Sequence, residues 1–181
     1  MSQERNEARI EPVTEADVEP LVALAREIWY AHYPDIIGAA QIEYMLAQRY
    51  GLETVRAELR QGDVWWDKLM AGGAMAGFAS YFLTGAAGEM KLDKLYVRPD
   101  SQRRGYGGLL IARACDVARG RGCTRLALAV NKRNRSAIAA YLKYGFRIAD
   151  ATVKEIGGGY LMDDYIMVKA IESAENADEC R

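Results

Sequence analysis

The stretch that decides the fold is residues 95–108, which read LYVRPDSQRRGYGG. An apolar strand runs through a basic turn into a helix that begins near Gly107. The glycines let the backbone approach a ligand closely, and the amides of the first helical turn, with the positive end of the helix dipole, attract an anion. Arg103 and Arg104 add positive charge to the same loop. The stretch therefore predicts a site for a phosphate or a pyrophosphate.

Two well-known nucleotide loops do not fit these residues. The chain contains no GxxxxGK[ST] pattern, and the Gly-Tyr-Gly at 105–107 is not a full GxGxxG dinucleotide fingerprint. The strands before the loop are joined by hairpins, whereas a Rossmann unit alternates strands with helices. A tight strand–helix connection that binds nothing is the alternative interpretation.

The elements around the loop follow from hydrophobic periodicity and from glycine-containing turns. Thr14 and Asp17 resemble a helix cap before a helix over 18–28, with further helices over 39–50, 107–119 and 134–144; residues 52–59 are expected to continue the second one after Gly51. Strands are expected over 10–13, 64–70, 75–83, 90–97, 125–130, 146–155 and 160–169. The sequence predicts one α/β (α+β) domain over residues 8–171, with disordered tails at 1–7 and 172–181.

Charge and cysteine usage exclude several classes of protein. Lys and Arg number 24 and Asp and Glu 25, so the net charge of −1 gives no attraction to nucleic acid or to an anionic membrane surface. No apolar run is long enough to span a bilayer, and the start is polar, which predicts a soluble, cytoplasmic protein. Three cysteines without CxxC spacing and one histidine, His32, predict ordinary thiols and no metal site.

A second motif lies downstream, where residues 134–146 read NRSAIAAYLKYGF. Together with QRRGYG at 102–107 it resembles the GNAT superfamily, whose signatures are Gln/Arg-x-x-Gly-x-Gly/Ala and Asn-x-x-Ala-x-x-x-Tyr-x-x-x-Gly-Phe. The resemblance covers about residues 89–146, and the flanking elements only in their order. It implies a central mixed, mostly antiparallel and splayed sheet of six to seven strands, flanked by about four helices.

The resemblance also implies acetyl-CoA as co-substrate and acetyl transfer to a primary amine by direct attack in a ternary complex. The residues that would bind the cofactor are Leu95, Tyr96, Val97, Gln102, Arg103, Arg104, Gly105, Tyr106, Gly107, Gly108 and Asn134. Taken singly, these residues favour a structural interpretation, with Asn134 as a helix cap, Tyr141 as a core tyrosine and Gly145 as a helix stop. A strand amide near Tyr96 or Val97 is the candidate donor to the developing oxyanion.

Two residues are candidates for proton transfer. The resemblance places the Tyr141 hydroxyl beside the cofactor sulfur, and a phenol with an ordinary pKa of about 10 holds a proton that it can give to the thiolate. Asp93 is the candidate base, with Glu89 as the other choice. The alternative for both is a solvated carboxylate at the end of a strand, near enough in sequence to pair with Lys91 or Lys94.

The acceptor side is the least specified part of the sequence. Trp29, Tyr33 and Tyr44 occupy the region that often forms the acceptor wall in this superfamily, although core packing explains aromatic residues equally well. The acceptor is expected to be a small-molecule or peptide amine, and the resemblance also suggests a homodimer. The alternative functions are a non-catalytic acyl-CoA-binding regulatory module and a phosphate-binding structural protein.

Overall fold

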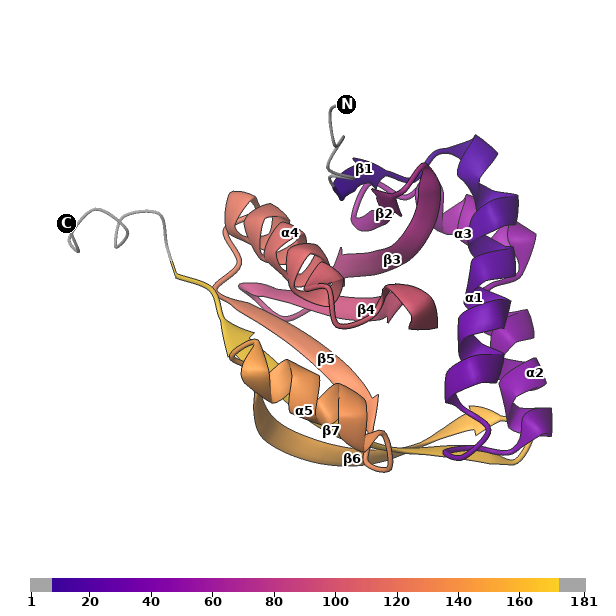
Figure 1. Ribbon diagram of the computed structural model, residues 1–181. Helices are drawn as coiled ribbons and strands as arrows, with labels where there is room; N and C mark the ends of the chain where they lie inside the picture. Colours follow the sequence, from indigo (N-terminus) through magenta and orange to yellow (C-terminus); the bar gives the residue numbers. More distant parts are fainter. Residues whose placement is uncertain (1–7, 173–181) are drawn as a thin grey trace. The chain divides into compact units, whose positions relative to one another are not determined.

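One mixed sheet with the strand order β1-β2-β3-β4-β5-β7-β6 organises the computed structural model, which describes residues 8–172 (Figure 1). The chain divides into two compact units that interleave in sequence. The first contains residues 8–80 and 94–111, and the second contains residues 81–93 and 112–172. Both β4 (Glu89–Val97) and α4 (Tyr106–Gly120) contribute residues to each unit.

The first unit combines the N-terminal strand, three helices and the first hairpin. Its complete elements are β1 (Arg9–Pro12), the 3₁₀ turn η1 (Glu15–Asp17), α1 (Val18–His32), α2 (Ala39–Arg49), α3 (Leu52–Leu59), β2 (Val64–Ala71) and the 3₁₀ turn η2 (Pro99–Ser101). Most of β3 (Ala74–Leu83) belongs to it as well. The predicted cap residues Thr14 and Asp17 flank η1, and α1 begins directly after that turn.

The second predicted helix is two helices, because Gly51 interrupts it. The Gly51 backbone is extended, its φ and ψ being −59° and 140°, and its carbonyl accepts the first bond of α3 from the Val55 amide. The described residues therefore contain five α-helices, where about four were expected.

The apolar spacing of α1 packs one face of the helix into the core. Its buried positions recur every three or four residues and include Leu21, Leu24 and Ile28, none more than 4% exposed. This is the face predicted from the sequence. Near the end of the helix, Trp29 packs against the aromatic rings of Tyr50 and Tyr96.

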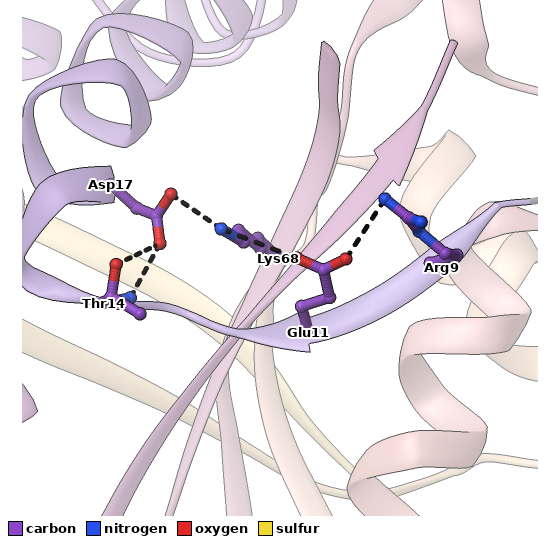
Figure 2. A network of polar contacts seen from close by, with 5 residues as sticks. All are labelled: Arg9, Glu11, Thr14, Asp17 and Lys68. Atoms are coloured by element: carbon purple, nitrogen blue, oxygen red, sulfur yellow. Dashed lines mark hydrogen bonds and ion pairs between the residues drawn. The ribbon is translucent and has the colours of Figure 1, made fainter. Parts of the chain in front are cut away.

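A polar network ties the start of α1 to the first two strands (Figure 2). One Asp17 carboxylate oxygen accepts hydrogen bonds from the Thr14 amide and hydroxyl, each at 2.8 Å, while the other accepts from Lys68 Nζ at 2.7 Å. Lys68 Nζ also lies 3.7 Å from Glu11, which pairs with Arg9. The burial of Asp17 raises the pKa of its carboxyl, but the bonds from Lys68 and Thr14 outweigh it and hold this pKa below the ordinary value.

The second unit is built around a long C-terminal hairpin. Here β5 (Arg125–Asn131) is parallel to β4 through Glu89–Lys91 and antiparallel to β7 (Tyr160–Ala170), and β7 pairs with β6 (Arg147–Gly157). Positive φ angles at Gly157, Gly158 and Gly159 turn the hairpin, as predicted. α5 (Arg135–Lys143) joins β5 to β6, so β7 inserts between two strands that precede it in sequence.

The cysteines in the described range are thiols. Cys115 and Cys123 are buried and free of disulfides, and burial raises the pKa of both thiols, which opposes a nucleophilic role. Cys180 lies outside the described residues, as do both predicted tails apart from Glu172, whose carbonyl accepts a bond from Arg119. Within residues 8–172 no helix has the length and apolarity to cross a membrane, and no three His, Cys, Asp or Glu side chains gather as a metal site.

The network around Asp17 predicts an acid-dependent part of the stability. A carboxyl pKa that folding lowers stabilises the protein above the unfolded pKa of about 4, and this contribution is lost as the pH falls through the folded pKa. Asp17→Asn should lower the free energy of unfolding by about 1–2 kcal/mol at pH 7 and by less at pH 3. Denaturant titrations at the two pH values measure this. Asp63→Asn, at an exposed turn, is the matched control; an Asp17→Asn effect that did not shrink in acid would contradict the account.

Candidate functional site

Two hydrogen bonds to backbone carbonyls, one from an amide and one from a side chain, shape the start of the loop between β4 and α4. The Ser101 amide donates to the Arg98 carbonyl at 2.9 Å, which closes η2. The Gln102 side-chain amide then reaches back and donates to the Val97 carbonyl at 3.2 Å. Gln102, one of the predicted cofactor residues, thus fixes the loop against the end of its own strand.

Left-handed backbone at two positions turns the loop into the helix. Arg103 has a φ of 62° and Gly105 a φ of 80°, and Arg103 is the only non-glycine residue with positive φ among the described residues. A side-chain-bearing residue in this conformation is strained, and such strain concentrates at functional sites. The Leu109 amide donates to the Gly105 carbonyl, so residues 106–108 form the first turn, whose amides lack intrahelical acceptors.

The glycines of this loop face open space. A Cβ built on Gly105 or on Gly107 meets no atom within 4 Å, and residues 102–105 are exposed. Solvent-exposed backbone beside first-turn amides and two arginines suits an anionic phosphate group. These residues therefore fit the pyrophosphate of a coenzyme A molecule.

A glycine that the sequence analysis did not single out controls how closely β3 and β4 approach. A Cβ on Gly77 would lie 2.6 Å from the Tyr96 carbonyl oxygen and 3.3 Å from the Val97 Cα. Next to it, the Arg98 amide donates to the Ala76 carbonyl at 2.8 Å. The signal was a glycine inside a strand pattern, which marks a close backbone approach. Gly77 therefore sets the position of the strand segment predicted to contact the cofactor.

Side chains alternate along the end of β4, so Lys94 and Tyr96 share a face. Lys94 is 3% exposed, and its Nζ lies 3.3 Å from Glu58 and 4.7 Å from the Trp66 ring centroid. The same Glu58 oxygen accepts a bond from Trp66 Nε1 at 2.9 Å. The alternative interpretation pairs Lys94 with a neighbouring β4 carboxylate, whereas this ion pair joins Lys94 to α3, because strand alternation turns the side chain that way.

Tyr96 points into a tyrosine cluster, defined here as Trp29, Tyr33, Tyr50, Phe78 and Tyr96. The Trp29 and Tyr33 ring centroids lie 4.4 Å apart, and the Trp29 and Tyr96 centroids 6.0 Å apart. The hydroxyls of Tyr33 and Tyr96 share a hydrogen bond, with their oxygens 3.1 Å apart. Of the predicted acceptor residues, Trp29 and Tyr33 thus meet the β4 segment.

Tyr44, the third predicted acceptor residue, and His32 make other contacts. Tyr44 accepts a hydrogen bond from Gln48 Nε2 at 2.7 Å along α2. The His32 ring lies edge-on to Tyr33, at a centroid distance of 5.0 Å.

The tyrosine cluster keeps the Tyr96 phenol protonated. Burial raises the pKa of Tyr96 well above its ordinary value, and the nearby Tyr33 and Tyr50 hydroxyls raise it further, whereas the Arg49 guanidinium lowers it. The Tyr96 side chain is accordingly a neutral phenol at neutral pH, and either hydroxyl can donate in its hydrogen bond with Tyr33. The sequence analysis assigned Tyr96 to the cofactor through its backbone and did not foresee this side-chain environment.

In the second unit, the second motif forms α5 and the turn after it. Asn134 is 5% exposed, and its side chain accepts from the Ala137 amide at 3.3 Å, which confirms the capping role. Tyr141 is half-buried, with its ring 5.5 Å from Phe146, whose amide donates to the Tyr141 carbonyl. Gly145 ends the helix with a φ of 87°.

Both candidate base carboxylates of the second unit form ion pairs. Asp93 lies 3.7 Å from Lys91 Nζ, as the alternative interpretation anticipated. Glu89 pairs with Arg125 Nε at 2.6 Å, a partner 36 residues away that the sequence analysis did not propose. The exposed fraction of the side chain is 16% for Asp93 and 19% for Glu89, so neither is a solvated strand end.

Comparison with known proteins identifies the family. Residues 19–146, more than half of the chain, match the family described as acetyltransferase (GNAT). The chain belongs to the GNAT acetyltransferase family, and its seven-stranded mixed sheet with flanking helices is the fold class expected from the sequence.

Several relatives are similar over most or part of the chain. The spermidine N(1)-acetyltransferase of Thermoplasma acidophilum is 27% identical over 163 residues, which cover 87% of this chain and 93% of the relative. The streptothricin acetyltransferase of Streptomyces lavendulae is 36% identical over 42% of this chain and 40% of its own length. The fold is similar to that of the PaiA N-acetyltransferase from Thermoplasma acidophilum, which was solved in complex with coenzyme A. The TM-score is 0.78 and the sequence identity is 24%, and the match covers 91% of this chain and 99% of the PaiA chain.

The close approach at Gly77 predicts a coupled loss of stability and cofactor affinity. Gly77→Ala forces the Tyr96 carbonyl away, which should cost about 1–3 kcal/mol of unfolding free energy. We also expect acetyl-CoA to bind at least about threefold more weakly, since β4 leads directly into the loop. Thermal melts and calorimetric titrations measure the two effects. Gly62→Ala, where an added Cβ meets nothing within 4 Å, should change neither; a Gly77→Ala protein with wild-type melting and affinity would refute the role.

Proposed function

We propose that this protein transfers the acetyl group of acetyl-CoA to a primary amine. The observation that carries the proposal is the left-handed turn at Arg103 and Gly105, which exposes first-turn amides of α4 at the end of β4. Membership of the GNAT acetyltransferase family and relatives named as N-acetyltransferases support the same activity.

The chain would hold the cofactor through its backbone more than through its side chains. The amides of residues 103–108 would bind the pyrophosphate, with Arg103 and Arg104 contributing charge. The backbone of Leu95, Tyr96 and Val97 would pair with the amide groups of the pantetheine arm as an added strand does. Gln102 and Asn134 would act by fixing the backbone, because the side chain of each bonds the local main chain.

The bound cofactor supplies an acetyl group activated as a thioester. A backbone amide near Tyr96 or Val97 would donate to the carbonyl oxygen as negative charge develops there. The Tyr141 hydroxyl would hold a proton and give it to the departing sulfur. Asp93 would accept the proton that the amine loses. Because Asp93 pairs with Lys91, the proton would reach the carboxylate through a water molecule and not by direct contact with the amine.

The relatives suggest a small amine as acceptor. Their names specify spermidine, thialysine and streptothricin as acceptors of those enzymes. For this chain we propose a small-molecule amine, bound beside Trp29 and Tyr33, in a protein that acts in the cytoplasm.

Release of free CoA thiol tests the proposal. Purified protein with acetyl-CoA should release thiol when a mixture of primary amines is added, and mass spectrometry should find acetylated amine in equal amount. Acetyl-CoA binding without thiol release or product, across polyamines, amino acids, aminoglycosides and peptides, would favour the non-catalytic regulatory module.

The hydroxyl of Tyr141 is the side-chain group with the most specific predicted role. Tyr141→Phe should lower kcat by about 100-fold, because it removes the proton that goes to sulfur. The affinity for acetyl-CoA should stay within about twofold of the wild-type value, since the ring packing on Phe146 is retained. Stopped assays of product formation, with calorimetry for binding, measure both quantities.

Tyr144→Phe is the matched control, since Tyr144 caps the same helix and loses the same oxygen. It should keep wild-type kcat. Equal rates for Tyr141→Phe and the wild type would show that another group supplies the proton.

A further inference from the structure

The outer edge of the C-terminal hairpin carries an inference about self-association, which is independent of the proposed function. In the described sheet β6 is the last strand, and it pairs only with β7 (Figure 1). None of its 11 residues is buried. The strand at the other end of the order, β1, has only four residues. A long exposed edge offers a row of unpaired backbone groups to another strand, whereas a short edge offers few.

Apolar side chains lie on one face of this edge. The β7 partners of Ile148 and Val153 are residues 167 and 163. These two residues share a face with Leu161, because even spacing along a strand keeps one side. Ile148, Val153 and Leu161 therefore lie on the same face of the hairpin, and they are 45%, 61% and 58% exposed. Burial of these side chains would favour association.

The backbone amides of Ala151 and Val153 point away from β7. The Ala151 amide donates to the Asp150 carboxylate at 2.8 Å, which directs it to the open side of the strand. Because inward and outward backbone groups alternate along an antiparallel edge, the Val153 amide shares this direction. Both residues lie in the regular segment 150–155, between the register irregularities at 148–150 and 155–157.

The charges of this segment complement those of a second copy. A two-fold axis through Thr152, perpendicular to the sheet, sets Asp150 of each copy opposite Lys154 of the other. The same axis sets Ala151 opposite Val153, the two residues whose amides point outward. An axis one residue earlier or later pairs no opposite charges within residues 150–155. Lys154 makes no ion pair with any other residue in the range 8–172, so its charge is available to a partner.

We propose that β6 pairs with β6 of a second copy of this chain, as an antiparallel two-fold pair centred on Thr152. Ala151 and Val153 exchange backbone hydrogen bonds across the axis, and two Asp150–Lys154 pairs fix the register. The apolar face of one edge continues into that of the other, which covers Ile148 and Val153 in part. The pairing uses the open edge of both strands, so it closes as a dimer and does not extend.

Charge reversal and its repair test this inference in sedimentation equilibrium experiments. The wild-type protein should have twice the mass of the chain at micromolar concentration. Lys154→Asp sets like charges opposite each other twice, and it should weaken the dimer at least about tenfold. Addition of Asp150→Lys to this variant restores opposite charges, and it should return the dissociation constant to within about threefold of the wild-type value. Arg60→Asp, the same charge change at an exposed residue of the first unit, should leave the dimer unchanged.

Hydrogen exchange locates the contact. The amides of residues 147–157 should exchange more slowly in the wild type than in Lys154→Asp, and circular dichroism should show that both proteins are folded. A monomeric wild type would overturn the inference, as would a dimer whose affinity Lys154→Asp leaves unchanged, or assemblies larger than a dimer. A wild-type monomer that dimerises after removal of residues 173–181 would assign the β6 edge to that segment, and it would also overturn the inference.

Discussion

The turn from β4 into α4 is the constraint on which the rest of the site depends. Its left-handed residues, Arg103 and Gly105, end a strand and begin a helix within a few residues, and this leaves the first-turn amides exposed. Arg103 takes a conformation that costs energy for any residue with a Cβ. Two contacts hold the turn in place. The Gln102 side chain donates a hydrogen bond to the Val97 carbonyl, and β3 approaches the backbone of β4 closely at Gly77.

Much of the fold could be predicted because its signals are local. The strand and helix bounds agree to within one or two residues for β2, β3, α4 and β5, where glycine turns bracket clear periodic patterns. The division at Gly51 was not predicted, since an isolated glycine inside a helical pattern is tolerated at a cost of about 1 kcal/mol and does not by itself end the helix. The insertion of β7 between β5 and β6 could not be predicted, because strand order depends on pairing between distant segments.

The same distinction separates the site residues. The loop at 102–108 and the capping role of Asn134 follow from short-range patterns of backbone conformation and hydrogen bonding. The ion pairs of Lys94 with Glu58 and of Glu89 with Arg125 join residues 36 apart in sequence, on another element in each case, so the spacing along β4 could not reveal them. Likewise, only the folded chain shows that Tyr96 faces Tyr33 and that Trp29 Nε1 is buried without a hydrogen-bond partner among residues 8–172.

The proposed cofactor binding and acetyl transfer both depend on the anion site proposed at residues 102–108. One binding comparison tests this site most directly. CoA and pantetheine share the thiol arm that β4 would bind, but only CoA has the pyrophosphate. Calorimetric titration of the wild-type protein with each should show CoA binding at least about 100-fold more tightly, as expected when several charge-assisted bonds are made to the phosphates. Equal affinities for CoA and pantetheine would contradict the assignment of residues 102–108 as the anion site.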